Sequence, residues 1–201
     1  MRGPVILRRY AFPSRKGEGW AIVVLGADGY FSAVSDYGNY AFMWTSTGYA
    51  DFRDFVVRLA DDADYVCGKI SRREFSPAGS KKLIREYIVS GRRDGSFDHR
   101  CFRDPIADPV ARRRFAEDDI ASPKAWARYE WELAEQIDGQ DSFRDWGERT
   151  IFFRDDWYEY AAEEFPWDAR NFCSKIMPQL AVALKAEIAT ERSAQAATSS
   201  A

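Results

Sequence analysis

The chain has 201 residues, of which 46% are apolar, 15% aromatic and 30% charged, and its mean hydropathy is −0.48. This composition excludes a disordered chain, which has few aromatic residues, and a membrane protein, which has far fewer charges. A net charge of −3 also argues against the overall basic balance that nucleic-acid binders usually show. We therefore expect a globular protein whose core needs no disulfides or metal to hold it together.

The first fifty residues predict an antiparallel β-meander of three or four strands within residues 4–46. Runs rich in β-branched and aromatic residues, each bounded by turn formers, are typical of strands. The runs cover residues 5–12, 20–25, 30–35 and 40–45. Asp28-Gly29 and Asp36 to Asn39 lie between such runs and tolerate the backbone of tight hairpins.

After the meander the hydrophobic period changes from two to about 3.6 residues, which predicts helices within residues 51–192. Asp51, Ser76-Pro77 and Ser122-Pro123 can each begin a helix. Asp and Ser are common N-caps, and Pro is favoured at the first helical position.

A short helix from Ser142 and a long one over about 168–192, interrupted or kinked at its proline, complete the prediction. Strands first and helices afterwards predict an α+β fold, with the meander packed against about four to five helices. We expect residues 1–192 to form a single domain. Residues 193–201 are expected to be a disordered tail with nothing to bury.

Charge is unevenly distributed along the chain. Residues 69–114 contain 13 Lys and Arg against 6 Asp and Glu, and residues 115–170 contain 6 against 16. We expect the two segments to meet within the fold or across a dimer, since charged helix faces usually neutralise each other. The alternative is a basic face that is free to bind phosphates. Its candidate nucleic-acid-binding residues are Arg92, Arg93, Arg100, Arg103, Arg112, Arg113 and Arg114.

Few residues are available for catalysis or metal binding. Cys67, Cys101 and Cys173 lie far apart, which predicts free thiols in a reducing compartment. His99 is the single histidine, so any metal site with two imidazoles is excluded. We expect no catalytic residue, no cofactor and no bound metal.

Carboxylate clusters at 61–64, 117–119 and 155–156 keep a metal-dependent nuclease open as an alternative. They fit helix N-termini and solvated faces better. The glycines at 17 and 19 precede a strand rather than a helix, so they do not predict a phosphate-binding loop. The sequence has no apolar stretch of the length of a membrane span, and we expect a cytoplasmic protein.

The aromatic residues around the hairpin at 36–40 predict a binding surface. The even-numbered aromatics of residues 30–44 would share one face of the sheet if the register is kept through the turn. Tyr37 would then be exposed at the tip, and tyrosines often anchor interfaces. The predicted partner-binding residues are Tyr37, Asn39 and Tyr49.

Residues 30–44 resemble a recurring family of tailed-phage and prophage proteins, as do segments 51–55, 64–69 and 171–180. The most distinctive string is Val34-Ser35-Asp36-Tyr37-Gly38-Asn39-Tyr40-Ala41. The resemblance implies a phage origin and a location in the host cytoplasm, and it assigns no catalytic residue.

Three hypotheses for the function follow. Small phage proteins without catalytic groups commonly act by binding, so the first is a non-enzymatic accessory protein that binds a host or phage protein, for example as an inhibitor of a host defence or a host enzyme. The second is a nucleic-acid-binding accessory protein that uses residues 69–114, and the third is a metal-dependent nuclease. The oligomeric state is left open.

Overall fold

The computed structural model describes residues 5–14, 17, 19–94, 123–150, 153 and 156–199. They group into two compact units, which we describe separately: the first falls within residues 1–73 and 165–201, and the second within residues 74–164. That residues 1–192 form a single folding domain stays a prediction, because compactness alone does not show whether two units unfold together.

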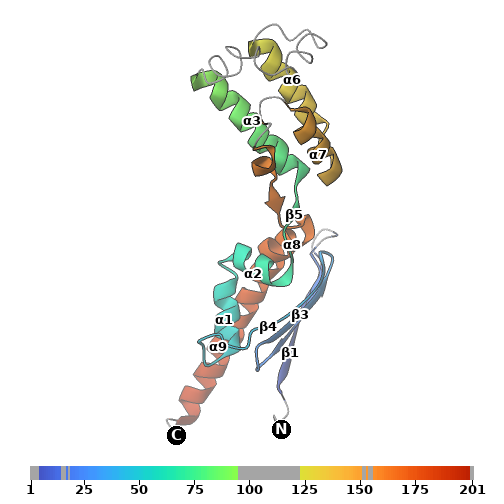
Figure 1. The fold of residues 1–201 in the computed structure, drawn as a ribbon. Helices are drawn as coiled ribbons and strands as arrows, with labels where there is room; N and C mark the ends of the chain where they lie inside the picture. The colour runs from blue at the N-terminus through green and yellow to red at the C-terminus, as the bar shows by residue number, and fades with distance from the viewer. Residues whose placement is uncertain are drawn as a thin grey trace. The chain divides into compact units, whose positions relative to one another are not determined.

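The first unit opens with an antiparallel sheet in the order β1-β2-β3-β4 (Figure 1). The strands are β1 (Leu7–Phe12), β2 (Ala21–Gly26), β3 (Tyr30–Ser35) and β4 (Gly38–Met43). Gly29 and Gly38 take φ angles of +95° and +109° at the hairpins, where other residues would be strained. The predicted meander is confirmed.

Helices form the second layer of this unit. They are α1 (Phe52–Leu59), α2 (Ala63–Ile70), α8 (Trp167–Asn171), a π-helical segment η2 (Phe172–Ile176) and α9 (Met177–Ser199). The Asp51 carboxylate accepts a hydrogen bond from the N–H of Arg53, which caps α1 as predicted. Asp62 caps α2 in the same way, so the acidic cluster at 61–64 contains a helix start.

The C-terminal helix differs from the prediction at its end. α9 continues to Ser199, although residues 193–201 were expected to be disordered. This tail is rich in alanine, the residue with the highest helix propensity, so the helix continues although it buries nothing there. The π-helical segment η2 ends two residues before Pro178, which cannot donate a backbone hydrogen bond.

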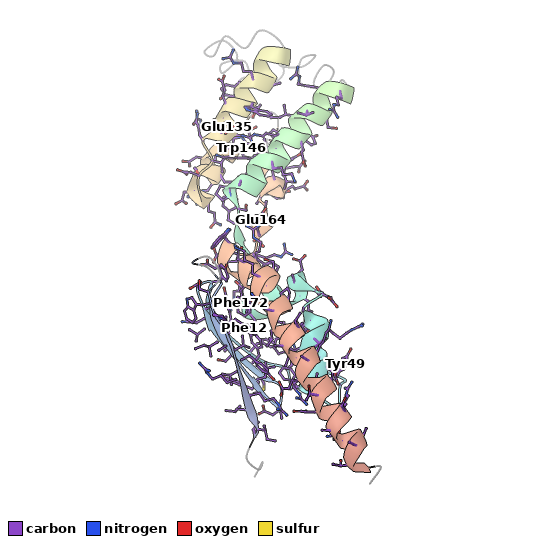
Figure 2. The ribbon with its side chains drawn as sticks, turned by 180° about the vertical axis from the view of Figure 1, so that it is seen from behind. Phe12, Tyr49, Glu135, Trp146, Glu164 and Phe172 are labelled. Atoms are coloured by element: carbon purple, nitrogen blue, oxygen red, sulfur yellow. The ribbon has the colours of Figure 1, made fainter. Side chains whose placement is uncertain are left out.

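The core of the first unit lies between one face of the sheet and the helices α1, α2 and α9 (Figure 1). Phe31 of β3 is fully buried, with its ring 5.9 Å from Trp44 and 6.3 Å from Phe172. Phe172 is labelled in Figure 2. Because β3 and η2 are far apart in the chain, these aromatic contacts fasten the C-terminal helices to the N-terminal sheet.

The partly buried Tyr40 is expected to make the folded protein less stable at alkaline pH. Its ring packs 4.7 Å from Phe172, and its hydroxyl donates a hydrogen bond to the carbonyl of Tyr37. Burial raises the pKa of Tyr40 to about 12, whereas a tyrosine in the unfolded chain ionises near pH 10. The unfolded state therefore loses its proton first, and stability decreases as the pH rises from about 10 to 12.

We expect Tyr40→Phe to weaken this dependence. Urea unfolding at neutral pH and at about pH 10.5 would show a smaller loss of stability for the variant than for the wild type. Tyr158→Phe, at an exposed tyrosine, controls for the removal of one phenol. An equal loss in Tyr40→Phe and the wild type would contradict the prediction.

The second unit is a helical cluster with a short two-stranded sheet. It contains β5 (Glu74–Phe75), α3 (Pro77–Asp94), α6 (Pro123–Glu135), α7 (Gln140–Arg149), the 3-10 turn η1 (Trp157–Tyr160) and β6 (Glu163–Glu164). Ser76 accepts a hydrogen bond from the N–H of Gly79, as expected at the start of α3. Trp146, labelled in Figure 2, packs with Phe143 and Phe153 in a second core.

The fold class is α+β, as predicted, with the helices following an N-terminal antiparallel sheet. The expected meeting of basic and acidic segments is confirmed at one ion pair, between Arg85 of α3 and Glu135 of α6. Lys81 strengthens the same helix pair by donating to the carbonyl of Glu135 at 2.8 Å.

Candidate functional site

The two faces of the N-terminal sheet are fixed by its strand register. Phe31 pairs with Phe42, and Tyr30 pairs with Met43. Paired residues point to the same side, so Tyr30 lies on the opposite face from Phe42. The prediction that Tyr30 shares a face with the aromatics of β4 is wrong, because the two-residue turn Asp36-Tyr37 pairs odd positions with even ones.

Tyr37 is not exposed at the tip of the hairpin. Its side chain is only 2% exposed and packs against Trp167, with ring centroids 5.9 Å apart. The Lys175 amine lies 5.2 Å from the Tyr37 ring. The prediction of an exposed Tyr37 is therefore wrong, because Trp167 of α8 and Lys175 of η2 cover its ring.

The other two predicted partner-binding residues are exposed. Asn39 is an exposed residue of β4. Tyr49 is exposed in the loop after β4, and its ring lies 5.8 Å from Phe55. A hollow of about 310 Å³ lies beside it, lined by Gly29, Trp44 and the loop residues up to Phe52. Asn39 and Tyr49 remain candidates for contact with a partner.

The helices described for the first unit all pack on one face of the sheet, and we call the other face the open face (Figure 1). Its side chains come from alternate positions of all four strands: Leu7, Arg9, Ala11, Ile22, Val24, Tyr30, Ser32, Val34, Asn39, Ala41 and Met43. Leu7 is 62% exposed, Val34 45% and Met43 44%. Arg9 is the one charged residue in this set.

The open face is more apolar than a solvated sheet face should be. A strand with one wet face alternates apolar and polar residues, whereas a strand covered on both faces is apolar throughout. β2 has the continuous apolar sequence Ala21-Ile22-Val23-Val24-Leu25. Sequence reasoning missed this surface, although that run was the signal that could have revealed it.

The hydrogen-bond pattern shows which backbone groups are free at the two edges of the sheet. The N–H of Ala27 donates to the carbonyl of Ile6 at 3.1 Å, and the register continues from this pair. Even positions of β1 therefore bond to β2, while the N–H and C=O of odd positions point outward. At β1 these outward positions are Leu7, Arg9 and Ala11. By the same rule, the bond from Trp44 N–H to Gly29 leaves Asn39, Ala41 and Met43 facing outward at β4.

An ion cluster centred on the buried Arg53 lies on the covered side of the sheet. The Arg53 guanidinium contacts Asp51 at 2.7 Å, Glu187 at 3.0 Å and Glu191 at 2.6 Å. Arg8 joins the cluster through Glu187 at 2.7 Å. Hydrogen bonds from Arg53 hold the pKa of Asp51 and of Glu191 below their usual values. The two arginines and the carboxylates neutralise each other, and their ion pairs hold α1, α9 and β1 together.

The two cysteines in the first unit are buried in contact. The sulfur atoms of Cys67 and Cys173 are 3.1 Å apart, and both residues are free thiols. Burial raises the pKa of both thiols, which keeps them protonated and weakens them as nucleophiles. Cys101 and His99 lie outside the described residues.

The predicted nucleic-acid-binding residues are only partly described. Arg92 and Arg93 are exposed near the end of α3. Arg100, Arg103, Arg112, Arg113 and Arg114 lie outside the described residues. In the part of the chain that the structure describes, no three His, Cys, Asp or Glu residues gather as they would around a metal ion. None of the described helices combines the length and apolarity needed to cross a membrane.

The fold and its surface define a small α+β protein with an exposed apolar sheet face. A family model described as a phage family matches residues 6–186. The match covers most of the chain, which therefore belongs to this phage family. No curated protein and no solved structure matches the chain.

Proposed function

We propose that this phage protein is a non-enzymatic accessory protein that binds another protein through the open face of its N-terminal sheet. The observation that carries the proposal is the exposure of Leu7, Val34 and Met43 on a sheet face with a single charge. Large apolar side chains exposed together on one face are a mark of protein interaction sites. The apolar run of β2 supports the same reading, since it is typical of a strand covered on both sides.

The partner is a host or phage protein with an apolar patch of its own. If it belongs to a host defence complex or is a host enzyme, occupying its surface would inhibit it. Asn39 on the open face would add a polar contact, and the exposed Tyr49 in the loop after β4 could add an aromatic one.

Val34→Glu tests the proposal, because it places a charge on an inner strand of the open face. Val182→Glu is the matched control, since Val182 is an exposed valine on α9. Proteins captured from host and phage-infected lysates would be identified, purified and measured for binding to each variant. We expect at least a tenfold weaker Kd for Val34→Glu and an unchanged Kd for Val182→Glu.

Thermal unfolding of both variants would show whether they stay folded. A Kd unchanged by Val34→Glu would overturn the proposal. So would the absence of any protein partner combined with oligonucleotide binding that weakens steeply with salt, which would favour the basic segment 69–114.

A further inference from the structure

We propose that β1 accepts an extended segment of the partner protein as a fifth strand of the sheet, with an acidic side chain of that segment near Arg9. The inference rests on the proposed function, because it specifies how the partner meets the sheet. Its basis is the outer edge of β1, where the N–H and C=O groups of Leu7, Arg9 and Ala11 point away from β2. A row of such groups is a template for another strand.

The size of the open face indicates that it needs an additional contact. Four strands about 4.8 Å apart, each six residues long at about 3.3 Å per residue, cover roughly 400 Å². A stable protein interface buries about 800 Å² on each partner. A strand added at β1 would widen the apolar face and supply main-chain hydrogen bonds at the same time.

Charge indicates the chemistry of the added strand. Arg9 is exposed, and it forms no ion pair with any described residue. An aspartate or glutamate opposite it would form a cross-strand pair of opposite charge. On either side of Arg9, Leu7 and Ala11 face the same way, so apolar residues would flank the acid at alternate positions of the partner strand.

A second copy of this chain is a poor occupant of the same edge. Antiparallel pairing of β1 with itself would place Arg9 of one copy opposite or diagonal to Arg9 of the other. Like charges at these positions are destabilising. Charged residues on an edge strand are a common device against self-association.

The opposite edge of the sheet, at β4, has no charged side chain that corresponds to Arg9. The outward positions of β4 carry Asn39, Ala41 and Met43. α2 also lies beside β4, with the Lys69 amine 5.7 Å from the Phe42 ring. β4 therefore supplies the matched control, because Ala41 on this edge, like Ala11 on β1, is exposed and has its backbone N–H and C=O pointing outward.

The experiment uses the full chain and a short fluorescent peptide in which valine and threonine alternate around a central aspartate. One further peptide has lysine in place of the aspartate. Another has the same sequence as the aspartate peptide but carries methyl groups on alternate backbone nitrogens. Ala11→Pro removes one outward N–H without removing a bond to β2, and Ala41→Pro does the same at β4. Arg9→Glu reverses the charge, and Arg58→Glu does so at an exposed arginine of α1.

We expect the aspartate peptide to bind the wild type, Ala41→Pro and Arg58→Glu alike. Ala11→Pro and Arg9→Glu should each weaken binding about tenfold or more, as should the lysine and methylated peptides. Amide hydrogen exchange at Leu7, Arg9 and Ala11 should slow when the peptide is bound. Failure of the aspartate peptide to bind would overturn the inference, as would equal losses in Ala11→Pro and Ala41→Pro. A wild-type dimer that Ala11→Pro dissociates would also overturn it, in favour of a second copy.

The captured partner separates this inference from the proposed function. If Val34→Glu loses the partner while Ala11→Pro keeps it, the open face is the binding surface and the added strand is wrong. If both variants keep the partner, the proposed function itself is wrong.

Discussion

Replacing Arg53 with alanine is expected to lower the free energy of unfolding by about 3 kcal/mol. Arg53 is 8% exposed, and its guanidinium holds Asp51, Glu187 and Glu191 together. Its loss would leave three neighbouring carboxylates without their shared cation. The carboxylates are partly exposed, so the cost should fall at the low end of that for breaking a buried ion pair. Urea unfolding followed by circular dichroism would measure it.

The same variant should change the response to acid. The pKa of Asp51 is lowered in the folded protein, first by its hydrogen bond from Arg53. Its contribution to stability is therefore present above the pKa of the unfolded chain and lost as the pH falls through the lower, folded pKa. Arg53→Ala should lose less stability on acidification than the wild type. Arg58→Ala, at an exposed arginine of the same helix, should change stability by less than about 0.5 kcal/mol. Equal losses in Arg53→Ala and Arg58→Ala would contradict the prediction.

Trp146→Ala is expected to destabilise the second unit by about 3–5 kcal/mol. The indole is 2% exposed and packs 5.4 Å from Phe143 and 5.3 Å from Phe153. Trp131→Ala on α6 is the matched control, since Trp131 is 38% exposed and should cost clearly less. Calorimetry of the full chain would measure both variants, and a loss for Trp146→Ala no larger than that for Trp131→Ala would contradict the prediction.

Together, Arg53→Ala and Trp146→Ala also test the single-domain prediction. If residues 1–192 unfold cooperatively, both variants will lower one shared transition. If the two units unfold independently, each variant will lower a different transition.

The sequence predicted those parts of the fold that depend on neighbouring residues. The strands followed from short apolar runs between turn formers, and Asp51 was identified as a helix cap from its position before an apolar stripe. The capped start at Ser76 was found in the same way. Local backbone preferences decide these features, so a single sequence is enough to predict them.

Features that depend on distant residues were not predicted. Tyr37 is buried because Trp167 covers it, and Arg53 is buried because Glu187 and Glu191 lie on a helix at the other end of the chain. The face on which Tyr30 lies depends on the length of one turn, and a change of one residue would reverse it. Counting charges along the chain predicted that a basic segment meets an acidic one. It could not predict that Arg85 of α3 and Glu135 of α6 form the ion pair.

The path of the chain through the first unit has an evolutionary consequence. The chain leaves this unit after Arg73 and returns at Phe165, and these two residues touch, with the guanidinium 4.4 Å from the centre of the ring. The second unit is thus an insertion whose two attachment points are neighbours. An inserted unit of this kind can become longer, become shorter or be replaced while its two attachment points in the first unit stay in place. We expect members of this phage family to differ most in length and sequence between these two points, while the sheet and its C-terminal helix stay recognisable.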